Sequence, residues 1–272
     1  MKLETFCREI SLNQEAIRLV MELEYGISRE TFDRTKNLFY KDKEGFFAEI
    51  KSRKNYRQMF LFYYCKMACE TYERYREKGI GDDIFRDTFS DISLWCEECG
   101  EKCGEYGLQE YRWLWRHIEM TIFRLGRLQF EKMDSEWEFR YKGRQIRKGD
   151  EVISIHIPKG ERLKKEDCIH SFEQGRNFWG KDYPYICHSW LLFPGLKEVL
   201  GPDSNILQFQ QLFEILQVDY EYREGEERIF RELKDSPEEY DESTSLRRNA
   251  KEYLCKGGRL GSGFGVWRMP CG

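Results

Sequence analysis

The spacing of hydrophobic positions divides the chain into two parts. Up to about residue 125, apolar side chains recur every three or four residues, a period that predicts amphipathic helices. The longest expected helices cover about 55–78, 82–103 and 108–124. Residues 1–124 are therefore predicted to form an all-helical N-terminal domain.

After Gly126 the period changes towards two, which is typical of β-strands. Several expected strands follow, separated by helical patterns. The strands are expected at about 128–132, 152–157, 184–192, 218–223 and 227–233, the last two as a hairpin around Gly225. The helices are expected at about 165–179, over about 204–216 with Ser204 as its cap, and from Ser243 to Gly257. Strands that alternate with helices predict a mixed α/β domain over residues 125–272, so the fold class is α+β with two domains.

The prolines support this division of the chain. All six lie beyond residue 157, so none interrupts the expected N-terminal helices.

Composition narrows the classes of function. The 272 residues are 40% hydrophobic and 35% charged, with a formal net charge of −4, which argues against a nucleic-acid-binding protein. The N-terminal segment carries charges that interrupt any signal-peptide core, and no stretch approaches the ~20 apolar residues of a membrane span. Ten cysteines without an export signal are expected to be reduced thiols. We therefore expect a cytoplasmic protein with no membrane partner that acts on a small molecule, and its oligomeric state stays open.

Three cysteines have a spacing that invites a zinc interpretation. Cys96, Cys99 and Cys103 follow the pattern C-x2-C-x3-C. Zinc needs four ligands, and these three share one face of an expected helix with no second C-x2-C pair in the chain. We predict reduced, inward-facing thiols and no metal.

Two of the four histidines lie within expected strands. His156 and His188 occupy mid-strand positions, where a polar ring needs a hydrogen-bond partner or a function. Histidine is well suited to act as a general base near neutral pH. Both are candidate bases, and their rings would lie close together if the two strands are neighbours. A purely structural, hydrogen-bonded ring is the alternative at each position.

Two further motifs are considered for anion binding. The glycine-rich segment 257–263 is followed by no expected helix, so a turn into a last strand is favoured over a phosphate loop. Arg247 and Arg248 lie in the first turn of an expected helix, where cations oppose the helix dipole. An anionic ligand would explain them, and two solvated arginines are the alternative.

The chain resembles a known two-domain family in several segments of its C-terminal half. These segments are HIP (156–158), CHSWLLFPGLKEVLGPDSNILQF (187–209), STSLRR (243–248) and KGGRLGSGFG (256–265), and residues 95–131 resemble the junction of the two domains. The family occurs in Firmicutes and is described as acyltransferases. It joins a helical acyltransferase-associated domain to a domain similar to the GNAT N-acyltransferases.

This resemblance implies an acyl-CoA co-substrate and no metal. In the GNAT superfamily a central strand splays from its neighbour and exposes backbone amides to acyl-CoA, and the following loop leads into a helix whose N-terminus holds the pyrophosphate. Segment 184–200 would supply that strand, turn and helix. The cofactor-binding residues would then be Pro194, Gly195 and Leu196, with Arg247 and Arg248.

The resemblance also suggests roles in acyl transfer. His188 or His156 would deprotonate the acceptor, and Ser189 or Tyr185 would polarise the carbonyl or protonate the leaving thiolate. In a regular strand, Tyr185 and Ser189 point to the face opposite His188. The alternatives are a non-catalytic protein that binds a metabolite or carbohydrate on a diverged acyltransferase fold, and an interaction module built on the helical domain.

Overall fold

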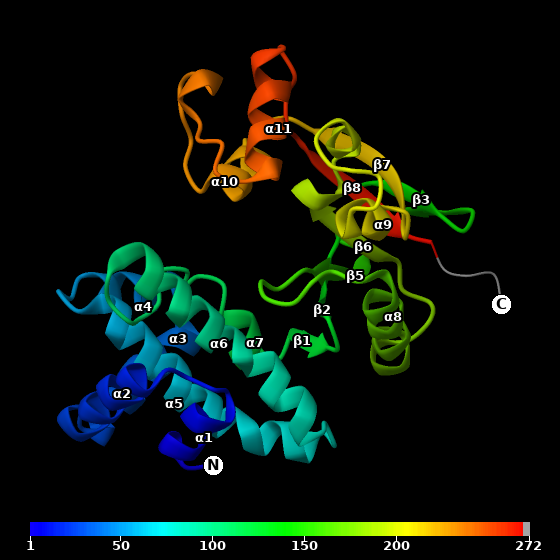
Figure 1. Cartoon of the computed structure of the whole chain (residues 1–272). Coiled ribbons are helices and arrows are strands. Elements are labelled where there is room, and N and C mark those ends of the chain that lie inside the picture. The colour runs from blue at the N-terminus through cyan, green and yellow to red at the C-terminus, as the bar shows by residue number, and fades with distance from the viewer. Residues whose placement is uncertain (269–272) are drawn as a thin grey trace. The chain divides into compact units, whose positions relative to one another are not determined.

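The computed structural model describes residues 1–268, which form two compact units (Figure 1). The first unit contains Met1–Leu125 together with Pro158–Gly160, and the second contains Gly126–Ile157 and the chain from Glu161 onward. None of the helices within residues 1–268 has the length and apolar composition needed to cross a bilayer.

The first unit is helical and is built around α5. Its elements are α1 (Leu3–Glu9), α2 (Gln14–Gly26), α3 (Arg29–Lys41), α4 (Lys43–Lys51), α5 (Tyr56–Glu77), α6 (Asp82–Cys103), α7 (Trp115–Glu119) and the strand β1 (Ile122–Leu125). Seven consecutive residues of α5, 59–65, are buried, so this stretch of the helix is enclosed on all sides. It contacts α1, α2, α3, α4, α6 and α7.

The expected helix over 108–124 is wrong. The chain instead forms the short helix α7, and Met120 ends it in the left-handed conformation with φ of 61°. The strand β1 follows at once. The alternation of apolar residues at 122, 123 and 125 is too short to separate a strand from a helix by period alone.

The second unit is an α/β domain built on a mixed sheet. Its elements are β2 (Leu128–Asp134), β3 (Phe139–Tyr141), β4 (Arg144–Ile146), β5 (Glu151–His156), α8 (Lys165–Trp179), β6 (Tyr185–Ser189), η1 (Trp190–Leu192), η2 (Pro194–Glu198), α9 (Asn205–Gln210), β7 (Phe213–Asp219), α10 (Glu224–Phe230), η3 (Pro237–Glu239), α11 (Ser245–Cys255) and β8 (Ser262–Trp267). Within this unit the strand order is β2-β5-β6-β8-β7. Strands β5 and β6 are parallel and are joined through α8, and the other neighbouring pairs are antiparallel.

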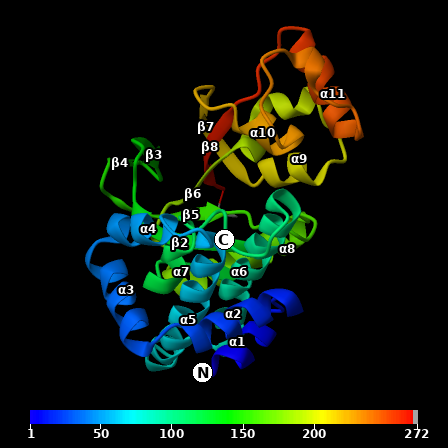
Figure 2. The same cartoon turned by 90° about the vertical axis from the view of Figure 1, so that its left-hand side faces the viewer.

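The two faces of this sheet are covered differently. Helix α8 covers one face, where the rings of Phe172 and Trp267 stack with centroids 4.3 Å apart. The β3–β4 hairpin covers part of the other face and packs Phe139 and Ile146 against Val152 and Ile186. Figure 2 shows the hairpin and α8 on opposite sides of β5.

Two expectations for the C-terminal half are wrong. The expected hairpin at 218–223 and 227–233 is replaced by β7 and α10, and the helix expected over about 204–216 ends at Gln210. Strand β7 instead pairs along the edge of β8, which shows that tertiary pairing overrode the local helical pattern.

The glycine-rich segment 257–263 forms a turn that leads into a last strand, as expected. That strand is β8, which begins at Ser262 and lies between β6 and β7 in the sheet. A Cβ at Gly263 would collide with the carbonyl of Leu192, so glycine permits the close approach of two backbones there.

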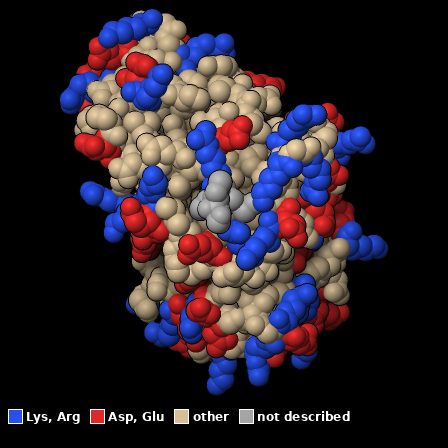
Figure 3. Space-filling view, turned by 90° about the vertical axis from the view of Figure 1, so that its right-hand side faces the viewer, with Lys and Arg blue, Asp and Glu red and all other residues tan. Residues whose placement is uncertain are grey.

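Charged residues of both signs are interspersed over the face shown in Figure 3. This mixed surface accompanies the net charge of −4 and differs from the one-sided basic patch of a nucleic-acid binder.

Candidate active site

The parallel strands β5 and β6 separate towards their C-terminal ends. Their register contains only two pairs, Ile153 opposite Tyr185 and Ser154 opposite Ile186. Beyond them β5 stays paired with β2 as far as His156, and β6 stays paired with β8 as far as Ser189. Both strands therefore continue while the ladder between them stops, which leaves an opening inside the sheet.

Backbone polar groups line this opening. The amide of Ile153 donates to the carbonyl of Pro184 at 2.9 Å, so Ile153 directs its backbone groups towards β6. Backbone direction alternates along a strand, so Ile155 on β5 and His188 on β6 direct their amides and carbonyls into the opening. A ligand with amide groups can bind there as an added strand would.

His156 stands at the β5 side of the opening and is held by a carboxylate. Its Nε2 lies 2.9 Å from Oε2 of Glu131 on β2. Gln129 is directly opposite His156 in the antiparallel register, so Glu131 is the diagonal neighbour on the same face. The Glu131 side chain is 7% exposed and that of His156 is 27% exposed. A nearly buried acid therefore orients an imidazole that solvent can still reach.

Gln129 adds a buried donor beside this pair. It is almost completely buried, and its Nε2 has no hydrogen-bond partner within the described chain. Its position opposite His156 places both side chains on one face of the sheet. A buried amide without an acceptor calls for an explanation, and an oxygen of a bound substrate would supply the acceptor.

His188 occupies the matching position at the β6 side. Because Ser154 is opposite Ile186, His156 and His188 each lie two residues farther along their strands, on the same face. The Nε2 atom of His188 lies 3.8 Å from Oδ2 of Asp219. Its ring centroid lies 5.5 Å from that of Trp137. The structure thus places the two predicted histidines on neighbouring strands, on one face, at either side of the opening.

Family models match both parts of the chain. Residues 122–267 match the model of the GNAT-like C-terminal domain, and residues 1–120 match the N-acyltransferase N-terminal domain. The chain belongs to this GNAT-like acyltransferase family. The expected α+β fold with two domains is confirmed.

Solved structures with the same fold are also acyltransferases. One, in complex with decanoyl-CoA and teicoplanin, has a TM-score of 0.75 at 18% identity and covers 97% of this chain and 86% of its own. Another, in complex with CoA and 10C-teicoplanin, has a TM-score of 0.75 at 17% identity, with the same coverage. A third, in complex with decanoyl-CoA, has a TM-score of 0.68 at 18% identity and covers 99% and 100% of the two chains. No curated protein matches the chain.

In this GNAT-like acyltransferase, the hydroxyl groups of Tyr185 and Ser189 form hydrogen bonds within the fold. The Tyr185 hydroxyl donates to the carbonyls of Gly175 and Gly180 at 2.9 and 2.8 Å, on the α8 face of the sheet, and burial raises its pKa. Ser189 caps η1, because its hydroxyl oxygen accepts from the amide of Leu191 at 3.1 Å. Tyr185 is therefore on the far face from His156 and His188.

The segment predicted to hold the cofactor belongs to a small core. Pro194, Gly195 and Leu196 form the start of η2, a helix of five residues. Leu196 is buried against Phe193 and its neighbours. This turn contributes packing, and the other strand at the opening, β5, is followed by a second loop, which leads into α8.

Arg247 is also bound within the protein, whereas Arg248 is exposed on α11. The Arg247 guanidinium donates to the carbonyl of Ile229 and pairs with Asp241 at 2.6 Å. Hydrogen bonds from Ser243 and from Arg247 lower the pKa of Asp241 to about 2. Arg247 therefore ties the end of α10 to the start of α11.

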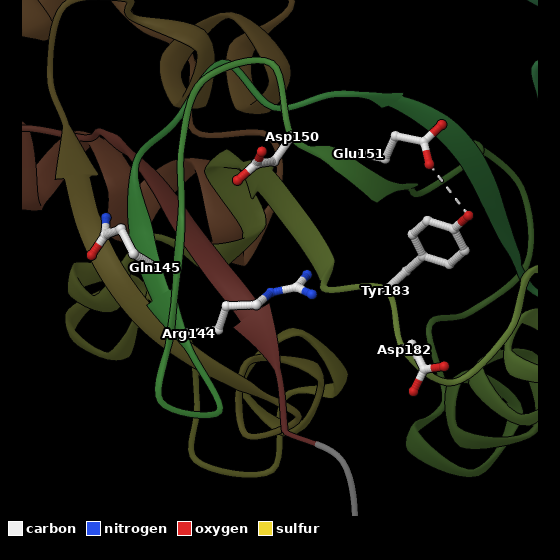
Figure 4. Close-up of a pocket in the computed structure, with 6 residues that line it drawn as sticks. All are labelled: Arg144, Gln145, Asp150, Glu151, Asp182 and Tyr183. Atoms are coloured by element: carbon white, nitrogen blue, oxygen red, sulfur yellow. Dashed lines mark hydrogen bonds between the residues drawn. The ribbon is translucent and has the colours of Figure 1, made fainter.

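A pocket of 420 Å³ lies at the opposite end of β5 (Figure 4). It is lined by Arg144, Gln145, Asp150, Glu151, Asp182 and Tyr183. Glu151 pairs with Lys132 at 2.8 Å and accepts from the Tyr183 hydroxyl at 3.4 Å. Ligands of parallel sheets bind at the carboxyl ends of the strands, and this pocket lies at their amino ends.

The predicted inward-facing thiols are present. Cys96 and Cys99 are buried on α6 and Cys103 is partly buried. In the part of the chain that the structure describes, no three metal-ligating side chains lie together, and every cysteine is a free thiol.

Proposed function

We propose that the chain transfers an acyl group from acyl-CoA to the amino group of a small-molecule acceptor at the opening between β5 and β6. The observation that carries this proposal is the two-residue register of the parallel strands within a GNAT-like domain. The solved acyltransferases of the same fold that bind decanoyl-CoA and CoA support the choice of co-substrate.

The pantetheine arm of the co-substrate carries amide groups that suit the opening. The backbone groups of Ile155 and His188 would pair with them, as an added strand pairs with a sheet edge. This arrangement brings the thioester between His156 and His188 on the hairpin-covered face.

The loop before α8 is our candidate for the pyrophosphate. Lys164 is the N-cap of α8 and provides no side-chain acceptor for the first-turn amides. Those amides are the groups that bind phosphate at a helix N-terminus. The buried Arg127 fixes the loop by donating to the carbonyl of Glu161 at 2.8 Å. The carboxylates of Glu166 and Asp167 offset the positive charge of the nearby lysines. The proposed phosphate binding therefore depends on the backbone amides.

His156 is proposed as the general base. In this proposal the Nε2–H group of His156 donates to Glu131, which favours the tautomer that has its lone pair on Nδ1. The base takes a proton from the acceptor amine as its nitrogen attacks the thioester carbon. The Gln129 amide is a candidate donor to the carbonyl oxygen as it becomes negative.

We further propose that the protein acts in the bacterial cytoplasm on a small molecule. The free thiols of the described cysteines support a reducing compartment. The mixed surface charge supports a small-molecule acceptor over a nucleic acid.

Decanoyl-CoA provides the test of this function. We expect the wild-type protein to bind it in a calorimeter, and to release free CoA thiol when amines from a small-molecule panel are added. His156→Gln should keep the binding and lower the release of CoA by about 10²–10⁴-fold.

His170→Gln is the matched control, because His170 is an exposed histidine on α8. This variant should match the wild type in both measurements. Absence of decanoyl-CoA binding by the wild-type protein would overturn the proposed function. Unchanged turnover in His156→Gln would overturn the role of His156 alone.

A further inference from the structure

The second histidine–carboxylate pair at the opening has a role of its own. We infer that His188 is the general acid that protonates the departing CoA thiolate, and that Asp219 positions its ring. This inference rests on the proposed function, and it assigns the two histidines opposite tasks in one reaction.

The two pairs differ in how firmly the ring is held. His156 is within hydrogen-bond distance of Glu131, at 2.9 Å, and Glu131 is nearly buried. His188 is 3.8 Å from Asp219, which is beyond hydrogen-bond distance but close enough for the carboxylate to attract a charged ring. The ring fixed by a hydrogen bond suits a base that needs one tautomer. The ring beside an ion-pair partner suits a group that begins the step protonated.

Aromatic packing keeps the His188 ring on the correct face. Phe264 is opposite His188 in the β6–β8 register, and Trp137 stacks on Phe264 with centroids 4.7 Å apart. The His188 ring then lies against Trp137 with 30% of its side chain exposed. Solvent can therefore return a proton to the ring after each turnover.

A β-bulge brings Asp219 to this face. The β7–β8 register runs from Phe213 opposite Trp267 to Asp219 opposite Ser262, and β7 contains one more residue than β8 over that span. The irregularity lies between Ile215 and Gln217. Without the extra residue, the alternation that starts at Phe213 would turn Asp219 to the α8 face.

The other carboxylate oxygen of Asp219 is held by a backbone hydrogen bond. Its Oδ1 accepts from the amide of Glu221 at 2.6 Å, which leaves Oδ2 directed to His188. The bulge and this bond together place the Oδ2 atom of Asp219 beside the His188 ring. Both features are local distortions of an otherwise regular strand, and such distortions are common next to active sites.

The proposed step balances in atoms and charge. The acceptor nitrogen bonds to the acyl carbon and gives one proton to His156. The carbon–sulfur bond breaks, and the sulfur takes the proton of His188. The products are an amide and CoA thiol, with His156 protonated and His188 neutral. Exchange with solvent then restores both rings.

Other candidates for this proton are committed elsewhere. Tyr185 donates its hydroxyl to two carbonyls on the α8 face. Buried Cys187 lies on that same face, one residue before His188, and burial raises its pKa. Both lie on the opposite side of the sheet from the proposed acid.

Changing the leaving group tests the acid directly. A thiolate of low basicity leaves without help, so an acid matters for decanoyl-CoA and not for the decanoyl thioester of 4-nitrothiophenol. With a fixed amine, His188→Gln should lower kcat/KM for decanoyl-CoA about 10²-fold. For the activated thioester, kcat/KM should change by less than about threefold. His156→Gln should lower both equally, because both substrates need the amine deprotonated.

Asp219→Asn tests the positioning residue with the same two substrates. It should lower kcat/KM for decanoyl-CoA about tenfold and leave the activated thioester nearly unaffected, as in the His188→Gln pattern. Glu214→Gln is the control, because it removes an exposed carboxylate of β7 that lies opposite Val266, away from His188. It should leave both substrates unchanged.

Chemical rescue provides a second measurement if the activated thioester is a poor substrate. His188→Ala should regain turnover of decanoyl-CoA with added imidazole, and the rescue should grow with the imidazolium fraction as the pH is lowered. If the rescued turnover instead grows with the fraction of neutral imidazole as the pH is raised, His188 acts as a base and the inference is overturned. Equal losses of His188→Gln on both thioesters would overturn it as well. Wild-type protein without any turnover would count against the proposed function instead.

Discussion

Two histidine–carboxylate pairs in this protein have nearly the same geometry and different surroundings. In the helical unit, Nε2 of His117 lies 3.1 Å from Oδ2 of Asp91. In the α/β unit, the corresponding distance between His156 and Glu131 is 2.9 Å. The side chains of His117 and Asp91 are 1% and 4% exposed, whereas that of His156 is 27% exposed.

Two contacts of the His117 pair close it to a substrate. The indole of Trp113 also donates to Asp91, at 3.0 Å. The Nδ1 atom of His117 is buried and has no hydrogen-bond partner within residues 1–268. A proton taken up by this ring would therefore have no acceptor to pass to. The pair can hold α6 and α7 together, but it cannot exchange protons with a substrate.

The comparison shows that a short distance between histidine and carboxylate does not identify a base. His156 differs in its place, at the edge of an opening lined by backbone amides. Access for the acceptor and an outlet for the proton separate a catalytic pair from a structural one. The predictions below alter one pair and leave the other as a reference.

Asp91→Ala should have the largest effect. It leaves the buried His117 and the partly buried Trp113 without their shared acceptor, which should cost about 3 kcal/mol of unfolding free energy. Denaturant unfolding followed by circular dichroism measures this loss. The CoA released per folded molecule should stay at the wild-type level.

Glu97→Ala is the control for Asp91→Ala, since Glu97 is an exposed carboxylate on the same helix. It should change the unfolding free energy by less than about 0.5 kcal/mol. A loss of turnover in folded Asp91→Ala protein would mean that the closed pair takes part in function, and the comparison would fail.

Glu131→Gln applies the opposite logic to the open pair. The amide has the same shape as the carboxylate and can still contact the ring, so we expect the variant to fold. Turnover of decanoyl-CoA should nevertheless fall about tenfold or more, because the carboxylate that sets the His156 tautomer is gone. Steady-state kinetics measures the fall, and thermal unfolding confirms that the fold is kept.

The same acid-to-amide change at the other end of β5 provides the reference. Glu151→Gln alters an exposed carboxylate that binds Lys132 and Tyr183 beside the pocket of Figure 4. It should leave turnover unchanged. An equal fall in both variants would show that β5 transmits a general distortion and that Glu131 has no specific role.

The sequence predicted the division into a helical part and an α/β part, together with β5, α8 and β6. It also placed both active-site candidates, His156 and His188, on strands. The sequence pattern also placed Glu131 on a strand, where Gln129 and Glu131 alternate with Leu128, Phe130 and Lys132. The pairing of Glu131 with His156 depends on the antiparallel register, which no local pattern contains.

Asp219 could not have been predicted. Its approach to His188 needs the bulge in β7, and β7 itself overlaps a segment with a helical pattern. The loop for the pyrophosphate was sought after β6 because the strand, turn and helix there match the expected order. Only the pairing of β5 with β6 shows where the sheet opens, and that the loop from β5 to α8 also begins at this opening.

The thiols of the helical unit give the smallest expected effect and test how closed that unit is. Burial raises the pKa of Cys96 to about 12 from an ordinary value near 9. At pH 8 the folded protein therefore holds Cys96 as an unreactive thiol. Exposed Cys255 should react with a maleimide at once, and Cys96 should react only as the unit unfolds.

The same burial predicts a dependence of stability on pH. A group whose pKa is higher in the folded state contributes its full stability below the unfolded pKa, near 9, and loses it as the pH rises towards 12. The folded helical unit should therefore become easier to unfold, and its Cys96 faster to label, as the pH passes 9.

Peptide mapping after short labelling times identifies each modified cysteine, with Cys255→Ser as the control that removes this fast-reacting thiol. Labelling of Cys96 as rapid as that of Cys255 at pH 8, or stoichiometric zinc in protein purified without chelators, would show that α6 is open to solvent or to a metal. The contrast between a closed helical unit and an open α/β site would then no longer hold.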